Sequence, residues 1–231
     1  MRAGVAGMGI AVGAAIVSAV EAIAPASAKN RNAMDEGPAR ITLRIYDYVH
    51  LDHSTLLAAE GEASEILAQA GIEARWLDCP TSHNEESSFP DCPSDWHAND
   101  FAVRLLPNAM VNWRTKWQES LGSTNPCENL GTCTANVFCE RVTAMATGVS
   151  ASLPILLGRA MAHEIGHLLL GVGSHSPTGI MRASWSGQDF TLLGRPYLLF
   201  TREQSRQMKS RLAVRAQAWQ AQMGTGVIVE R

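Results

Sequence analysis

The sequence predicts a single α/β domain, and three observations lead to that fold class. Residues 41–77 are predicted to form a strand, a helix and a strand, and such a helix most simply joins two parallel strands through a right-handed crossover. Residues 153–170 form a helical segment that is apolar on nearly all sides, as in a buried helix. The 231 residues are 46% hydrophobic and 18% charged with a net charge of −3. That balance is typical of a folded soluble protein and gives no indication of nucleic-acid binding.

The first 28 residues are predicted to be a secretory signal peptide. Arg2 gives a positive start, an almost uninterrupted apolar run follows over 4–20, and small residues at 26–28 suit a signal peptidase. The alternative is an uncleaved membrane anchor. Glu21 and Pro25 interrupt the apolar run, whereas a spanning helix needs about 20 apolar residues. We therefore expect a secreted, extracellular or periplasmic protein without stable membrane insertion.

The strand–helix–strand unit is defined by two changes of periodicity. Apolar and polar residues alternate over 41–49, which predicts a strand. Apolar residues then recur at helical spacing until Gly71, with Asp52 or Ser54 available as the N-cap. Alternation resumes over 72–77, which predicts the second strand.

Two further strands are predicted in the middle of the chain. Residues 101–105 alternate again, and Pro107 ends this strand. Residues 108–133 contain several turn-forming residues and are predicted to be irregular. Residues 135–142 are predicted to form the next strand.

The chain is predicted to end in a helix that starts with a capping box at Thr201 and Gln204. Its expected buried stripe consists of Met208, Leu212, Ala216, Trp219 and Met223. The domain is therefore expected to span residues 41–223. A linker over 29–40 would precede it and a short tail over 224–231 would follow.

Five cysteines fall after the signal peptide, where an oxidising compartment favours disulfides. Cys79 and Cys92 bracket a polar loop and are predicted to pair. The other three cysteines, Cys127, Cys133 and Cys139, can form one further disulfide. Pairing of Cys127 with Cys133 is predicted, as a weaker prediction than Cys79 with Cys92. Cys139 lies in a strand-like run and is expected to be a buried small hydrophobe.

The buried helix contains the sequence His163-Glu164-Ile165-Gly166-His167. Histidines four residues apart lie on one face of a helix, so their rings can converge on one metal ion. Glu164 is placed to act as the general base toward a metal-bound water. The alternative is a pair of hydrogen-bonded core histidines beside an ion-paired glutamate. The cost of burying these polar groups without partners favours a metal.

A catalytic zinc site needs a third protein ligand, and His175 is the leading candidate. Gly171 and Gly173 precede it and can turn the backbone sharply out of the helix. Glu203, near the start of the last helix, is a rival ligand, although a favourable charge at a helix N-terminus also explains it. Asp189 is a second rival, but its neighbours do not match the pattern of an aspartate-ligand site.

With these residues the sequence resembles the metzincin clan of zinc metallopeptidases. The resemblance implies His163, His167 and His175 as zinc ligands, Glu164 as the base and Met181 as the methionine of a turn below the metal. It also implies an α/β (α+β) zincin-like fold. Such a fold has a twisted, mostly parallel sheet of four to five strands, a buried active-site helix and a C-terminal helix.

The sequence departs from the clan in one place. The usual pattern places a glycine three residues and the third histidine six residues after the second histidine. Here Leu170 occupies the glycine position, and His175 follows His167 by eight residues. The turn is thus two residues longer, which is typical of a divergent, small, bacterial-type member.

The resemblance implies a secreted zinc-dependent endopeptidase that hydrolyses peptide bonds through a zinc-activated water, with Glu164 as the general base and Zn²⁺ as the cofactor. We expect a monomer that binds an extended protein or peptide substrate along an edge strand, and no nucleic acid. One alternative is a zincin-like exoprotein that binds zinc without catalysis, which intact Glu164 disfavours. The other is a gluzincin-type peptidase with Glu203 as the third ligand.

Overall fold

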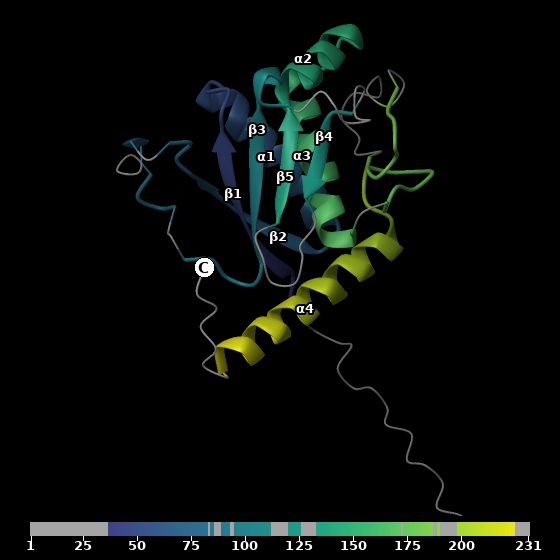
Figure 1. Cartoon of the computed structure of the whole chain (residues 1–231). Coiled ribbons are helices and arrows are strands. Elements are labelled where there is room, and N and C mark those ends of the chain that lie inside the picture. The colour runs from purple at the N-terminus through teal and green to yellow at the C-terminus, as the bar shows by residue number, and fades with distance from the viewer. Residues whose placement is uncertain are drawn as a thin grey trace, which may run out of the picture. The chain divides into compact units, whose positions relative to one another are not determined.

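A five-stranded sheet with the strand order β2-β1-β3-β5-β4 forms the centre of the fold (Figure 1). Its strands are β1 (Ala39–Asp47), β2 (Ile72–Asp78), β3 (Asp100–Leu106), β4 (Gly122–Asn125) and β5 (Thr134–Phe138). The first four in this spatial order run parallel, and β4 runs antiparallel to β5 at the edge. The predicted α/β fold with a mostly parallel sheet is therefore confirmed.

The computed structural model describes most of the chain after residue 36. The described residues are 37–82, 84–85, 89–92, 95–111, 120–125, 133–171, 173–186, 189 and 198–224. The predicted signal peptide over 1–28 lies outside them, as do most of the predicted linker and the tail after Gly224. No helix in these described segments is long and apolar enough to cross a membrane.

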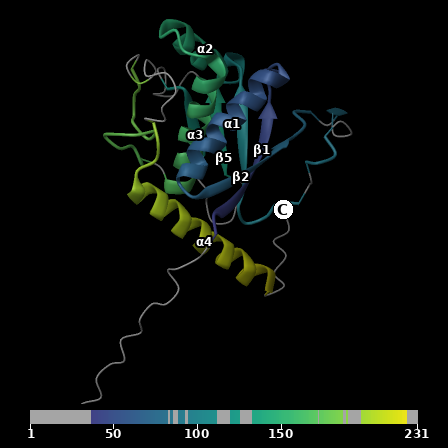
Figure 2. The ribbon, with the colours of Figure 1, turned by 180° about the vertical axis from the view of Figure 1, so that it is seen from behind.

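Helices α1 (His53–Gln69) and α3 (Leu153–Leu170) lie side by side over one face of the sheet, as the reverse view shows (Figure 2). Asp52 is the N-cap of α1, since its carboxylate accepts a hydrogen bond from the backbone N–H of Thr55 at 2.9 Å. Gly71 follows the helix with a φ of 76°, a conformation that favours glycine, and leads directly into β2. The predicted strand–helix–strand opening is confirmed.

The two faces of β1 are buried in different ways. Ile41, Leu43 and Ile45 point into the apolar core between the sheet and the helices. Arg44 points the other way and is 1% exposed, because it pairs with Asp100 at 2.7 Å and its guanidinium lies over the Trp96 ring. A charge at this depth is tolerated because it is paired. Arg44 thus holds the segment before β3 against the sheet.

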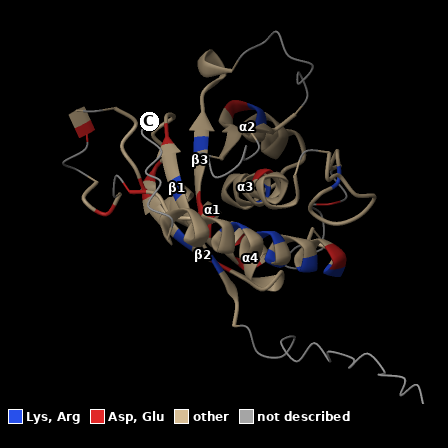
Figure 3. Ribbon diagram, turned by 60° about the horizontal axis from the view of Figure 1, so that its bottom comes forward, with Lys and Arg blue, Asp and Glu red and all other residues tan. Residues whose placement is uncertain are grey.

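Helix α4 (Arg202–Gly224) crosses the ends of the strands and helices and carries many basic residues (Figure 3). The predicted capping box is present: Thr201 Oγ1 accepts from the Gln204 N–H at 3.2 Å, and Gln204 Oε1 accepts from the Thr201 N–H at 2.8 Å. Lys209 lies beside Gly71 after α1, and Arg211 lies beside Gly171 after α3. Cations are favourable at helix C-termini, so α4 stabilises the ends of both core helices.

Two predicted segments and part of the predicted buried stripe are wrong. The strand predicted over 135–142 ends at Phe138, and helix α2 (Cys139–Gly148) begins there. The segment predicted to be irregular over 108–133 contains a short 3-10 helix (Asn108–Met110) and strand β4. In the predicted buried stripe, Met208 and Leu212 are buried, but Ala216 and Trp219 are only half-buried and Met223 is 70% exposed, because α4 extends beyond the elements it contacts.

The cysteines follow the predicted pattern where the structure describes them. Cys79 and Cys92 form a disulfide with a Cα–Cα distance of 5.2 Å. Cys133 is disulfide-bonded, and its predicted partner Cys127 lies outside the described residues. Cys139 is a buried free cysteine, as expected, but it begins α2 instead of lying in a strand. Burial raises the pKa of its thiol to about 12, so it packs as a small apolar side chain.

The contact between α1 and α3 depends on Gly158. A Cβ at this position would lie 2.4 Å from the backbone oxygen of Ala59 and 2.7 Å from Glu62 Cβ, so the helices would have to separate. We predict that Gly158→Ala lowers the free energy of unfolding by about 1–3 kcal/mol. Gly61, in α1, has nothing within 4 Å of such a Cβ. Gly61→Ala should therefore stabilise the helix by up to about 1 kcal/mol. Denaturant unfolding of both variants checks this, and a loss of the same size in both would contradict it.

Candidate metal centre

Helix α3 places the two histidines and the glutamate of the motif at the boundary between the core and solvent. The helix starts after Ser152 with Pro154 in its first turn, where a missing N–H has little cost. Two-thirds of its residues are buried, so little of its surface reaches solvent. His163 and His167 lie one turn apart and are only partly buried, and Glu164 between them is 6% exposed. The helix thus presents two imidazole rings toward the surface above an apolar core.

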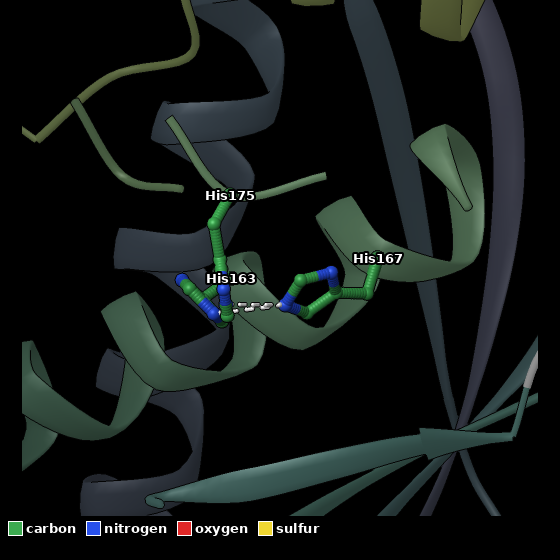
Figure 4. Close-up of side chains that lie close together, drawn as sticks. All are labelled: His163, His167 and His175. Atoms are coloured by element: carbon green, nitrogen blue, oxygen red, sulfur yellow. Dashed lines mark hydrogen bonds between the residues drawn. The ribbon is translucent and has the colours of Figure 1, made fainter. Parts of the chain in front are cut away.

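A glycine turn brings His175 back to the same place. Gly171 has a φ of 92° and Gly173 a φ of 76°, values that disfavour side chains with a Cβ. The N–H of Gly171 donates to the carbonyl oxygen of His167 at 2.9 Å, which closes the last turn of α3. The chain then reverses, and the exposed ring of His175 comes to lie beside the other two (Figure 4).

The three rings meet through the same kind of atom. His167 Nε2 lies 3.1 Å from His163 Nε2 and 3.1 Å from His175 Nε2. Two nitrogen ligands of a tetrahedral zinc ion lie about 3.3 Å apart, given zinc–nitrogen bonds of about 2.0–2.1 Å. Among the described residues, His163, His167 and His175 form a group whose ligand atoms lie close enough together to hold a metal ion. The spacing and the all-imidazole donor set both fit zinc with an open fourth position.

The second nitrogen of each helix histidine has a partner of its own. His163 Nδ1 lies 2.7 Å from the carbonyl oxygen of Ile180, and His167 Nδ1 lies 3.0 Å from Ser174 Oγ. A carbonyl only accepts hydrogen bonds, so His163 carries its proton on Nδ1 and presents an Nε2 lone pair. Partners of this kind orient metal-ligating histidines.

Burial keeps the helix histidines neutral. The pKa of His163 and of His167 is lowered to about 4 from an ordinary value of 6.5, and desolvation is the main cause. Neighbouring histidine rings also lower it, whereas hydrogen bonds to Ile180 and Gly171 oppose the change. Neutral imidazole is the form that binds a metal ion, so these rings need not lose a proton near neutral pH.

The Glu164 side chain contacts the edge strand β4. Thr124 Oγ1 donates a hydrogen bond to Glu164 Oε2 at 2.8 Å. A Cβ on Gly122 would lie 2.7 Å from the Glu164 carboxyl carbon, so only glycine leaves room for the carboxyl group at this point of the strand. Desolvation raises the Glu164 pKa to about 7, and the hydrogen bond from Thr124 opposes that rise. A carboxyl group with such a pKa can both accept and donate a proton at neutral pH.

Met181 lies directly beneath the histidine helix. It is fully buried, and a Cβ on Gly166 would lie 2.4 Å from its Sδ atom. The turn that carries it is closed by the Ser176 N–H, which donates to the Met181 carbonyl oxygen at 2.8 Å. The Trp185 ring then packs edge-on against His163, with 5.5 Å between ring centroids. The methionine therefore packs under the site and takes no part in binding a ligand.

The two rival ligands have other partners. Glu203 is exposed in the first turn of α4, where it pairs with Arg206 and accepts from Gln207. Its hydrogen bond with Arg206 is the main cause of its lowered pKa. Asp189 pairs with Arg182 at 2.5 Å. Neither belongs to the histidine group.

Three contributors to the site are absent from the sequence-based prediction. Thr124 and Gly122 lie in a strand without apolar side chains, so no periodicity marks it. Ser174 had a weak signal, since it adjoins the candidate ligand His175 in a glycine-rich turn. Thr124 and Gly122 act through contacts across the fold, and Ser174 acts through the turn geometry after α3, neither of which a one-dimensional pattern reveals.

Comparison with known proteins shows that the chain is distantly similar to a solved protein structure. No protein-family model and no curated protein sequence matches the chain. Among solved structures, the chain is similar to archaemetzincin from Methanopyrus kandleri, with a TM-score of 0.39 and 18% identity. The match covers 77% of this chain and 97% of the other. A likeness at this level assigns neither activity nor ligand, so the site is interpreted from its own geometry.

The lowered pKa values predict how pH affects the metal-free protein. The unfolded chain protonates His163 and His167 below about pH 6.5, whereas the folded protein does so only near pH 4. The free energy of unfolding should therefore fall as the pH drops from 6.5 to 4. Glu164, whose pKa is raised, acts in the opposite sense as the pH rises toward 7. Urea unfolding at several pH values should show a weaker pH dependence below pH 6.5 in a His163→Ala/His167→Ala variant. Equal slopes in the two proteins would contradict the assignment.

Proposed function

We propose that the protein is a secreted, zinc-dependent endopeptidase that acts as a monomer, with His163, His167 and His175 as the zinc ligands. The observation that supports this most directly is the separation of 3.1 Å between His167 Nε2 and each of the other two Nε2 atoms. Two unprotonated imidazole nitrogens at this distance repel each other, and a cation between them removes the repulsion. The metzincin-like order of helix, glycine turn, third histidine and buried methionine supports the same proposal.

Glu164 is the proposed general base. When bound, zinc supplies Lewis-acid polarisation of the scissile carbonyl and lowers the pKa of a water molecule. Glu164 takes a proton from the attacking water and passes it to the leaving amine, which requires a carboxyl group that titrates near neutral pH. Its raised pKa and its hydrogen bond from Thr124 suit this role.

The proposed substrate is an extended peptide or protein segment that pairs with β4. This strand ends the sheet, so its outer edge is the place where another strand can be added. Because Thr124 of β4 donates to Glu164, a peptide on this edge would lie close to the base. A strand at the end of the sheet, beside a histidine cluster and a buried carboxyl group, supports peptide hydrolysis over metal storage.

Replacing Glu164 tests the catalytic role separately from metal binding. We predict that Glu164→Gln lowers hydrolysis of a peptide library or casein by about 10²–10⁴-fold, because general-base catalysis is lost. Its zinc content should stay at one ion per chain, since Glu164 is not a ligand. Glu203→Gln is the matched control, because that glutamate is exposed in α4, and it should retain both zinc and activity.

Two outcomes of that assay would contradict the proposal. Full activity in Glu164→Gln would remove the residue from the mechanism. A wild-type protein that holds zinc and cleaves no peptide in the library would favour a non-catalytic zinc-binding exoprotein instead.

Export is the remaining part of the proposal. It is supported by the apolar N-terminal segment, which ends in small residues, and by the Cys79–Cys92 disulfide, a bond that persists in oxidising compartments. We predict that N-terminal sequencing of the exported protein finds Lys29 as the first residue. Recovery of the intact chain in a membrane fraction would show that the segment is an uncleaved anchor.

A further inference from the structure

The partners of the two helix histidines differ in one chemical respect. Ile180 offers His163 a carbonyl oxygen, which only accepts, while Ser174 offers His167 a hydroxyl group, which both donates and accepts. His163 is therefore restricted to the tautomer with the proton on Nδ1. The Ser174 hydroxyl group, whose oxygen lies 3.0 Å from His167 Nδ1, does not itself impose this restriction. The His167 ring also has a backbone hydrogen bond with Gly171.

This difference matters because of the short Nε2 separations. If His163 carries its proton on Nδ1, its Nε2 atom offers only a lone pair to His167 Nε2, which lies 3.1 Å away. Without a metal ion the contact is favourable when His167 carries a proton on Nε2 and donates it to His163. The Nδ1 atom of His167 is then an acceptor, and the Ser174 hydroxyl group can donate to it.

Metal binding requires the opposite arrangement. The Nε2 atom of His167 must give up its proton to bind an ion, and a neutral ring then carries that proton on Nδ1. Rotation of the Ser174 hydroxyl group turns it from donor into acceptor, so the hydrogen bond persists and the ring need not move. One proton leaves Nε2, one is gained at Nδ1, and the ring stays neutral.

We propose that Ser174 is a positioning residue of the metal site, whose hydroxyl group holds the His167 ring in both tautomers. The inference rests on the proposed zinc site, but it assigns a role to a residue outside the ligands and the base. The turn makes the contact possible: Gly171 and Gly173, both with positive φ, bring Ser174 back over the end of α3. Ser174 is half-buried, which limits replacement of its hydroxyl group by water.

Zinc affinity gives the first test. We predict that Ser174→Ala raises the zinc dissociation constant by about 10–100-fold, the usual effect of losing a hydrogen-bond partner of a metal-ligating histidine. Ser174→Thr, which restores a hydroxyl group, should bind zinc nearly as tightly as the wild type. Ser184→Ala is the matched control, since Ser184 is an exposed serine that follows the turn of Met181. Competition with a chromophoric chelator measures all four proteins, and thermal unfolding without metal verifies that each is folded.

Nitrogen-15 NMR of the histidine rings gives the second test. In the wild-type protein the His167 proton should lie on Nε2 without zinc and on Nδ1 with zinc, while the His163 proton stays on Nδ1 in both. Equal zinc affinity of Ser174→Ala and wild type would overturn the proposal, and so would an unchanged His167 tautomer. If the wild type binds no zinc, the proposed zinc site is wrong. If the wild type binds zinc but Ser174→Ala has the same affinity or the His167 tautomer does not change, only the role of Ser174 is wrong.

Discussion

The close approach of three imidazole rings is the constraint on which the rest of the structure depends. His167 Nε2 lies 3.1 Å from both His163 Nε2 and His175 Nε2, on rings that come from a helix and from a turn beyond it. Such nitrogens avoid each other unless a proton or a cation lies between them. Burial keeps the helix histidines neutral, with pKa values near 4, so the rings meet as lone-pair donors and not as charged groups.

Several elements act together to keep this geometry. Gly166 lets Met181 and Phe200 pack against the underside of α3, because a Cβ there would overlap both side chains. The turn that follows His175 is tied to α4, since Gln204 Nε2 donates to Ser176 Oγ at 3.1 Å. On the other side, β4 reaches α3 through the hydrogen bond from Thr124 to Glu164. The turn of His175, Glu164 and the edge strand are thus connected to neighbouring elements by direct contacts.

The sequence predicted the elements that have a strong periodicity or a cap, and it missed those that depend on contacts across the fold. The apolar helix over 153–170, the cap at Asp52 and the capping box at Thr201 all appear as predicted. Strand β4 was missed because Gly122–Asn125 has no apolar side chain and forms only by backbone pairing with β5. The strand predicted over 135–142 included the first turn of α2, although Cys139, Val142 and Ala146 form one buried helical face. Ser174 could not be assigned, because its direction depends on two positive φ angles in the turn.

The claim that three histidines hold one zinc ion is tested most directly by the metal content of the purified protein. Mass spectrometry under native conditions would compare the wild type with His175→Ala and Glu203→Ala. We predict one zinc ion per chain in the wild type and in Glu203→Ala, and loss of zinc in His175→Ala. Retention of zinc by His175→Ala together with its loss from Glu203→Ala would contradict the histidine triad and indicate a gluzincin-type site. No zinc in any of the three proteins would mean that the histidines only pack and hydrogen-bond with one another.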